Sequence, residues 1–178
     1  MRLFIAVLFE DNIKNELLRF SERLRISSVS GNFTSPDNLH LTLAFIGETE
    51  RIRDIKDIMD GMDFGPFGIS LGRMGVFRRD GGDLYWIGLK YDPLLRTAAE
   101  YLRSELRKAG FDIENREFKP HITIGRQVAL NRGISDPRVS SESMTVRRVS
   151  LMRSERINGK LRYTEIYAKE LLSSETDH

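Results

Sequence analysis

An internal repeat of strand, helix and strand constrains the fold of this chain more than any other feature. Residues 2–9 (RLFIAVLF) are predicted to form a strand, and a second strand at 39–45 (LHLTLAF) follows a predicted helix. Residues 84–90 (LYWIGLK) and 121–126 (HITIGR) repeat this order with nearly the same spacing. Because the repeated segments keep their order, the sequence predicts two similar lobes that pack as one unit.

The predicted helices have recognisable ends and one apolar stripe each. Asp11 is expected to cap the first helix, and Asp92 is expected to cap the second, with Pro93 at its first helical position. A shorter helix is expected between Thr49, as its N-cap, and Gly61. The apolar stripes of the two long helices are Ile13, Leu17, Phe20 and Leu24 in the first, and Leu95, Ala98, Leu102 and Leu106 in the second.

The repeat extends to a further strand in each half. Residues 69–77 align with residues 144–152, and the Gly-Gly turn at 81–82 is the expected crossing point between the halves. We therefore expect an α+β fold in which two similar lobes of mainly antiparallel sheet with flanking helices are related by a pseudo-twofold axis around a central cleft. The expected boundaries are a single two-lobed domain over 1–178, with approximate repeat halves 1–80 and 81–178.

Composition excludes several classes of protein. The chain has no cysteine, so thiol nucleophiles, thiolate zinc sites and disulfide frameworks are excluded. The apolar run at 3–9 is too short for a membrane span, and acidic residues follow it at once. A net charge of +2 is too small for tight, sequence-blind binding of nucleic acid. We expect a soluble, cytoplasmic monomer with no membrane partner.

Two of the three histidines open the same four-residue pattern. His40 begins HLTL, with Thr42 two residues later, and His121 begins HITI, with Thr123 two residues later. Side chains alternate along a strand, so each imidazole and its hydroxyl share one face, about 6.5–7 Å apart. A single motif of this kind would be read as a structural histidine, whereas two copies at matching places in a repeat indicate function. The third histidine is the terminal His178.

A pair of imidazoles suits acid and base catalysis. One neutral ring can accept a proton while one protonated ring donates a proton, both near neutral pH. Such a pair fits in-line displacement at phosphorus, with Thr42 and Thr123 holding the non-bridging oxygens. Two histidines without a nearby carboxylate lack the third ligand of a catalytic zinc site. We therefore expect no metal and no cofactor.

These residues resemble the two-histidine phosphoesterases, and within them the RNA 2′,3′-cyclic phosphodiesterases, also called 2′-5′ RNA ligases. The chain departs from the family pattern at Phe33, where Trp is often found, and in the Gly-Gly-Asp turn before Trp86; both departures bear on substrate preference. The resemblance covers nearly the whole chain and rests on RLFIAV, on PDNLHLTLAFIGE at 36–48, on LYWIGLK at 84–90, on FKPHITIGR at 118–126, and on Ser154, Gly159 and Tyr163.

The resemblance implies metal-independent hydrolysis of an RNA 2′,3′-cyclic phosphate to a 2′-phosphate. It implies that His40 donates a proton to the leaving 3′ oxygen and that His121 activates water. Thr42 and Thr123 would hold the phosphate, and Arg126 would contact the substrate if the strand directs it to the histidine-bearing face. The implied partners are RNA ends with a cyclic phosphate, including tRNA fragments, or small cyclic nucleotides.

Two alternatives to hydrolysis of a 2′,3′-cyclic phosphate remain open. The resemblance also allows the reverse reaction, 2′-5′ joining of RNA ends, and a non-catalytic module that binds RNA ends is the alternative outside enzymes.

Phe45 shares the alternation of core-facing positions, and Phe4 lies in an apolar strand, so both are predicted to be core residues. Trp86 is left open between packing and base stacking.

Overall fold

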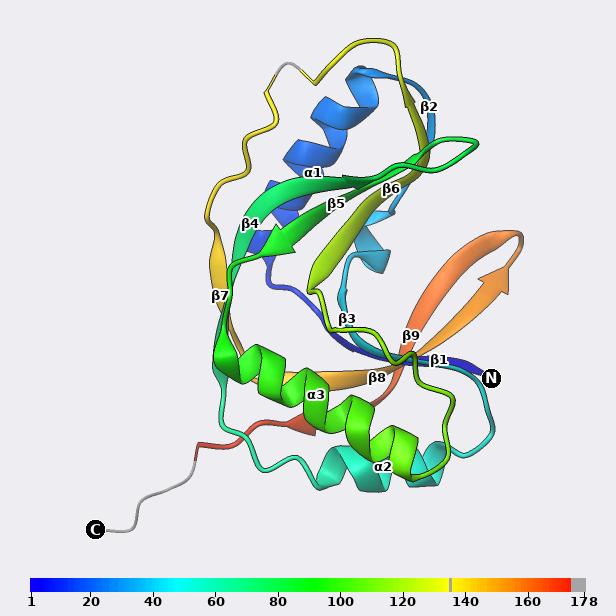
Figure 1. Cartoon of the computed structure of the whole chain (residues 1–178), viewed down its shortest axis with the longest axis vertical. Coiled ribbons are helices and arrows are strands. Elements are labelled where there is room, and N and C mark those ends of the chain that lie inside the picture. The colour runs from blue at the N-terminus through cyan, green and yellow to red at the C-terminus, as the bar shows by residue number, and fades with distance from the viewer. Residues whose placement is uncertain (135, 174–178) are drawn as a thin grey trace.

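The computed structural model describes residues 1–134 and 136–173 and contains two antiparallel sheets flanked by helices (Figure 1). The predicted α+β class is thereby confirmed, and His178 lies outside the described residues. The first sheet has the order β3-β1-β8-β9, with β1 at Arg2–Val7, β3 at Leu41–Glu48, β8 at Arg148–Ile157 and β9 at Lys160–Glu170. The second has the order β2-β6-β5-β4-β7, with β2 at Ser28–Phe33, β4 at Phe67–Phe77, β5 at Asp83–Leu89, β6 at His121–Leu130 and β7 at Ser143–Val146.

The helices cover one face of each sheet. Helix α1 (Asp11–Ile26) contacts β2, β6 and β7 of the second sheet, whereas α2 (Ile52–Asp60) and α3 (Pro93–Lys108) contact each other and strands of the first sheet (Figure 1). A short 3₁₀ helix, η1 (Pro36–Asn38), precedes β3. Within 1–134 and 136–173, no helix is long and apolar enough to cross a membrane.

The repeat is present, but the two sheets are not the two halves of the sequence. The orders β3-β1-β8 and β6-β5-β4 correspond strand for strand, yet β4 of the first half lies in the second sheet and β8 of the second half lies in the first. The tight turn at 81–82 explains this exchange, because strands joined by such a turn pair with each other. The halves 1–80 and 81–178 therefore describe the sequence repeat and not two separate lobes, and residues 144–152 divide between β7 and β8.

The helix ends match the sequence only in part. Asp92 caps α3 as predicted, because its Oδ1 accepts hydrogen bonds from two backbone N–H groups, both at 2.9 Å. The prediction for Asp11 is wrong by one position, since Glu10 is the N-cap of α1. Thr49 also lies outside its helix: Arg51 is the N-cap of α2, and its N–H donates to Thr49 Oγ1 at 3.1 Å.

Each histidine motif ends in a β-bulge. On β3, Thr42 and Ala44 pair with successive residues of β1, so Leu43 between them is the extra residue of the bulge. On β6, the partners on β5 pass over Ile124 in the same way. An extra residue inverts the alternation of side chains beyond it. The fourth residue of both motifs is therefore the point at which inward and outward positions are exchanged.

Candidate active site

His40 lies between η1 and β3, and both of its ring nitrogens are hydrogen bonded. Its Nδ1 lies 2.7 Å from the carbonyl oxygen of Asn38, and its Nε2 lies 2.9 Å from Thr42 Oγ1. A carbonyl oxygen can only accept, so Nδ1 carries a hydrogen in either charge state of the ring. Proton exchange at His40 is thereby confined to Nε2, the nitrogen beside the threonine.

Two aromatic rings enclose His40. The ring centroid of Phe4 lies 4.9 Å from that of His40, and the ring of Tyr163 on β9 lies edge-on at 5.1 Å. Burial lowers the pKa of His40, although the hydrogen bond to Asn38 opposes that effect. The neutral imidazole is therefore favoured at His40 in the free protein.

Charges on the second sheet act on the histidine of the first sheet. After burial and the Asn38 hydrogen bond, the next influences on the pKa of His40 are Arg126 and His121, both of which lower it. Burial raises the pKa of Tyr163, and the charge of Arg126 acts in the opposite direction with a smaller effect. The charges of the second motif thus act on the histidine of the first, although the two motifs lie far apart in the sequence.

His121 opens β6 and repeats half of the arrangement at His40. Its Nδ1 lies 2.8 Å from the carbonyl oxygen of Lys119, so this nitrogen also carries a hydrogen. Its Nε2 makes no hydrogen bond to any residue that the structure describes. The rings of Phe77 and Trp86 lie 6.0 and 6.1 Å away. His121 therefore presents a free nitrogen where His40 presents one bonded to a hydroxyl.

The bulges decide the positions of the residues that follow the motifs. Arg126 lies beyond Ile124 and is exposed, and its charge lowers the pKa of His40. Phe45 lies beyond Leu43 in the same way, so the prediction that it belongs to the core is wrong: the residue is 49% exposed. Strict alternation fails at both positions because the inserted residue exchanges the two faces of the strand.

The remaining aromatic residues pack beside the histidines. Phe4 is buried as predicted, although it contacts a motif histidine and not the main core. Trp86 packs against Phe77 with ring centroids 5.3 Å apart and leaves its Nε1 buried without a hydrogen-bond partner in the described chain.

Sequence reasoning assigned no role to Phe4, Phe77 or Tyr163 at the histidines. For one pair of aromatic residues a signal was available, because Phe4 and Trp86 are each the third residue of the first strand of their repeat. No such signal exists for Tyr163, which comes from β9, a strand outside the repeated unit.

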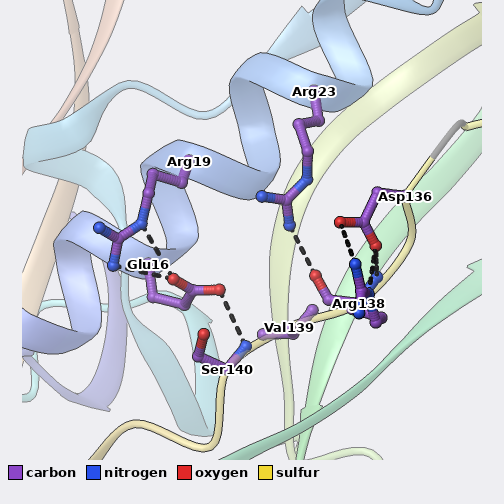
Figure 2. Close-up of a pocket in the computed structure, with 7 residues that line it drawn as sticks. All are labelled: Glu16, Arg19, Arg23, Asp136, Arg138, Val139 and Ser140. Carbon is purple, nitrogen blue, oxygen red and sulfur yellow. Dashed lines mark hydrogen bonds and ion pairs between the residues drawn. The ribbon is translucent and has the colours of Figure 1, made fainter.

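The hollow shown in Figure 2 is a structural junction away from the motif histidines. The carboxylate of Glu16 accepts hydrogen bonds from the N–H of Ser140 at 2.9 Å and from Arg19 Nε at 3.0 Å. Burial raises the pKa of Glu16, but hydrogen bonding to these two partners lowers that pKa by more, so the net shift is downward. Its acidic groups are thus paired with neighbouring donors, fixing the segment before β7 to α1. The hollow, about 570 Å³, is lined by Glu16, Arg19, Arg23, Asp136, Arg138, Val139 and Ser140.

No three histidine or carboxylate side chains gather closely enough to hold a metal ion in residues 1–134 and 136–173. The fold and the two motifs define a class, the phosphoesterases with paired histidine motifs. The chain belongs to the LigT like Phosphoesterase family, whose model matches residues 7–85 and 89–163. The family resemblance seen in the sequence is thereby confirmed.

Individual relatives agree with this assignment. The RNA 2′,3′-cyclic phosphodiesterase of Archaeoglobus fulgidus is 36% identical, with 80% of this chain and 83% of the relative covered. The protein of that name from Escherichia coli is 30% identical, with 93% of each chain covered. The crystal structure of Escherichia coli LigT complexed with 3′-AMP superposes with a TM-score of 0.85 at 28% identity, covering 97% of this chain and 98% of the other.

Proposed function

We propose that this protein hydrolyses RNA 2′,3′-cyclic phosphate ends to 2′-phosphomonoesters without a metal ion, using His40 and His121 as the acid and the base. The observation that carries the proposal is the matched pair of imidazoles. Each holds Nδ1 against a backbone carbonyl, which leaves Nε2 for proton transfer, and each is followed two positions later in the sequence by a threonine. The names of the relatives in the same family supply the class of substrate.

The free Nε2 of His121 is suited to accept a proton from water as the water oxygen attacks phosphorus. The bond from phosphorus to the 3′ oxygen then breaks, and Nε2 of protonated His40 donates a proton to that oxygen. The hydroxyls of Thr42 and Thr123 donate to the non-bridging oxygens, where negative charge accumulates. One proton is accepted and one is donated, so the site returns to its starting state after proton exchange with solvent.

Protonation of His40 depends on the substrate in this scheme. Burial and Arg126 favour the neutral ring in the free protein. A phosphodiester anion held by Thr42 and Thr123 offsets the charge of Arg126 and raises the pKa of His40. The acid is therefore formed when the substrate binds. Within the proposal, the substrates are RNA ends, including tRNA fragments, or small cyclic nucleotides, and the location is the cytoplasm.

The test is turnover of adenosine 2′,3′-cyclic phosphate and of a short RNA with the same end, measured with EDTA present. We expect full activity and a 2′-phosphate product, identified by phosphorus NMR and by resistance to a 3′-specific phosphatase. Activity that returns only with zinc or manganese, or a 3′-phosphate product, would contradict the proposal. Including a 5′-hydroxyl RNA as a competitor for water measures joining in the same reaction.

A further inference from the structure

The backbone supports His40 less directly than it supports His121. His121 is the first residue of β6 and pairs with Gly88 of β5. His40 lies before Leu41, the first residue of β3, and has no cross-strand partner among the described residues. The position of the His40 ring therefore depends on contacts made by the turn between η1 and β3.

Asn38, the last residue of η1, joins this turn to a distant strand. Its carbonyl oxygen accepts the hydrogen bond from Nδ1 of His40 at 2.7 Å. Its side-chain Nδ2 donates to the carbonyl oxygen of Leu161 in β9 at 3.0 Å. A carbonyl oxygen only accepts, so the amide nitrogen must be the atom that faces it. One residue is thus bonded both to the imidazole and to a strand 123 positions away.

Strand β9 contacts the turn at a second point. Tyr163, two residues after Leu161, packs edge-on against His40 with ring centroids 5.1 Å apart. The amide of Asn38 restrains the turn, and the phenol ring restrains the imidazole itself. Because Nδ1 is held by the turn, Nε2 is the nitrogen that lies beside Thr42. The direction of Nε2 is therefore set by the contacts of β9 with the turn.

The second motif is built without such a connection. The carbonyl oxygen beside Nδ1 of His121 belongs to Lys119, whose exposed side chain makes no hydrogen bond or ion pair to the described residues. His121 already has the pairing of β6 with β5. The bond from Asn38 to β9 thus supplies at His40 the support that sheet pairing supplies at His121.

We propose that Asn38 is a positioning residue that holds Nε2 of His40 in the direction needed for proton donation, by tying the turn before β3 to β9; the proposal rests on the proposed function. Proton donation requires the nitrogen to lie within hydrogen-bond reach of the leaving oxygen, and small displacements of such a group lower the rate. Without the amide, the turn is restrained less, and productive orientations of His40 become less frequent.

The test is Asn38→Ala, which removes the amide and keeps the carbonyl oxygen. We expect kcat on adenosine 2′,3′-cyclic phosphate to fall about tenfold and KM to change by less than about twofold, because orientation of the acid affects the chemical step. Asn12→Ala is the matched control, since Nδ2 of Asn12 also donates to a distant carbonyl oxygen, that of Ser143, at 2.8 Å. This control is expected to lose a similar small amount of stability and to keep the kcat and KM of the wild type.

Proton NMR of the imidazole gives a readout that does not depend on turnover. The Nδ1 hydrogen of His40 is expected to give a resolved signal in the wild type and to broaden by exchange with water in Asn38→Ala, with the ring signals of His121 unchanged. Wild-type kcat in Asn38→Ala, a change confined to KM, an equal loss in Asn12→Ala, or an unaltered Nδ1 signal would each overturn the positioning role. Absence of cyclic-phosphate hydrolysis by the wild type would overturn the proposed function, and the Nδ1 signal would still decide whether Asn38 holds the ring.

Discussion

The two motif histidines share a backbone arrangement and each has two aromatic neighbours, but they differ in the hydrogen bonding of Nε2 and in how closely the aromatic rings pack. Both hold Nδ1 against a carbonyl two residues earlier in the chain. At His40, Nε2 is bonded to Thr42 and the ring packs between Phe4 and Tyr163, whereas Nε2 of His121 is free of hydrogen bonds to the described residues. The repeat therefore determines that Nδ1 of each ring faces a backbone carbonyl, and the surrounding residues determine what Nε2 contacts.

The difference has a topological origin. Tyr163 comes from β9, which pairs with β8 at the edge of the first sheet. At the matching edge of the second sheet the chain places β7, a strand of four residues. The unrepeated strand therefore gives His40 a neighbour, Tyr163, that has no counterpart from the matching edge strand at His121.

Replacing either histidine is expected to lower activity more than any other change considered. We expect His40→Ala and His121→Ala each to lower kcat/KM by about 10²- to 10⁴-fold, since each removes a proton-transfer group. His40→Ala should be the more destabilising by about 1 kcal/mol, because its two aromatic neighbours lie 4.9 and 5.1 Å away, whereas those of His121 lie 6.0 and 6.1 Å away. Activity assays and thermal unfolding of both variants measure this. Near wild-type turnover by either variant would refute the two-histidine mechanism.

Replacing the two motif threonines is expected to have smaller effects, which differ between the two motifs. Thr42→Val and Thr123→Val should each lower kcat by about 10- to 100-fold, less than the histidine variants, through loss of a donor to the phosphate oxygens. Of these two hydroxyls, only that of Thr42 is hydrogen bonded to an imidazole nitrogen within the part of the chain that the structure describes. Only Thr42→Val should therefore also move a limb of the bell-shaped dependence of kcat/KM on pH. Identical pH profiles for the two variants would show that the Thr42 contact does not affect His40.

A glycine tests the support behind His121. A Cβ at Gly75 would overlap the ring of Trp86, which packs near His121, so Gly75→Ala should destabilise the protein by about 1–3 kcal/mol and lower activity by less than tenfold. Gly68→Ala is the matched control on the same strand, because a Cβ there meets nothing within 4 Å. Chemical denaturation of both variants measures the difference. Equal stabilities would mean that Trp86 is not held by Gly75.

The smallest expected effect concerns the influence of Arg126, on the second sheet, on the pKa of His40 beside the first sheet. Arg126→Gln should raise the pKa of His40, because one of the charges that lower it is removed. A histidine whose folded pKa lies below its ordinary 6.5 binds protons more readily when unfolded, so wild-type stability should fall as pH decreases below 6.5. In Arg126→Gln this fall should be shallower. Ring-proton NMR titration measures the pKa, and an unchanged value would place Arg126 out of range of His40.

The sequence by itself determined the repeat, the histidine and threonine pairs, and local features such as the cap at Asp92. These are properties of short segments, since hydrophobic period and capping chemistry need only neighbours along the chain. The relation of Phe4 to Trp86 was also present in the sequence, as matching positions in two strands.

The tertiary structure decided the exchange of β4 and β8 between the sheets and the faces on which Phe45 and Arg126 lie. A bulge is defined by pairing with another strand, so alternation along β3 or β6 alone could not locate it. The contact of His40 with Tyr163 likewise depends on the tertiary structure, because β9 brings Tyr163 to His40 from more than a hundred residues away in the chain. Burial and electrostatic effects of this kind depend on distances in space, and these exist only once the sheets have formed.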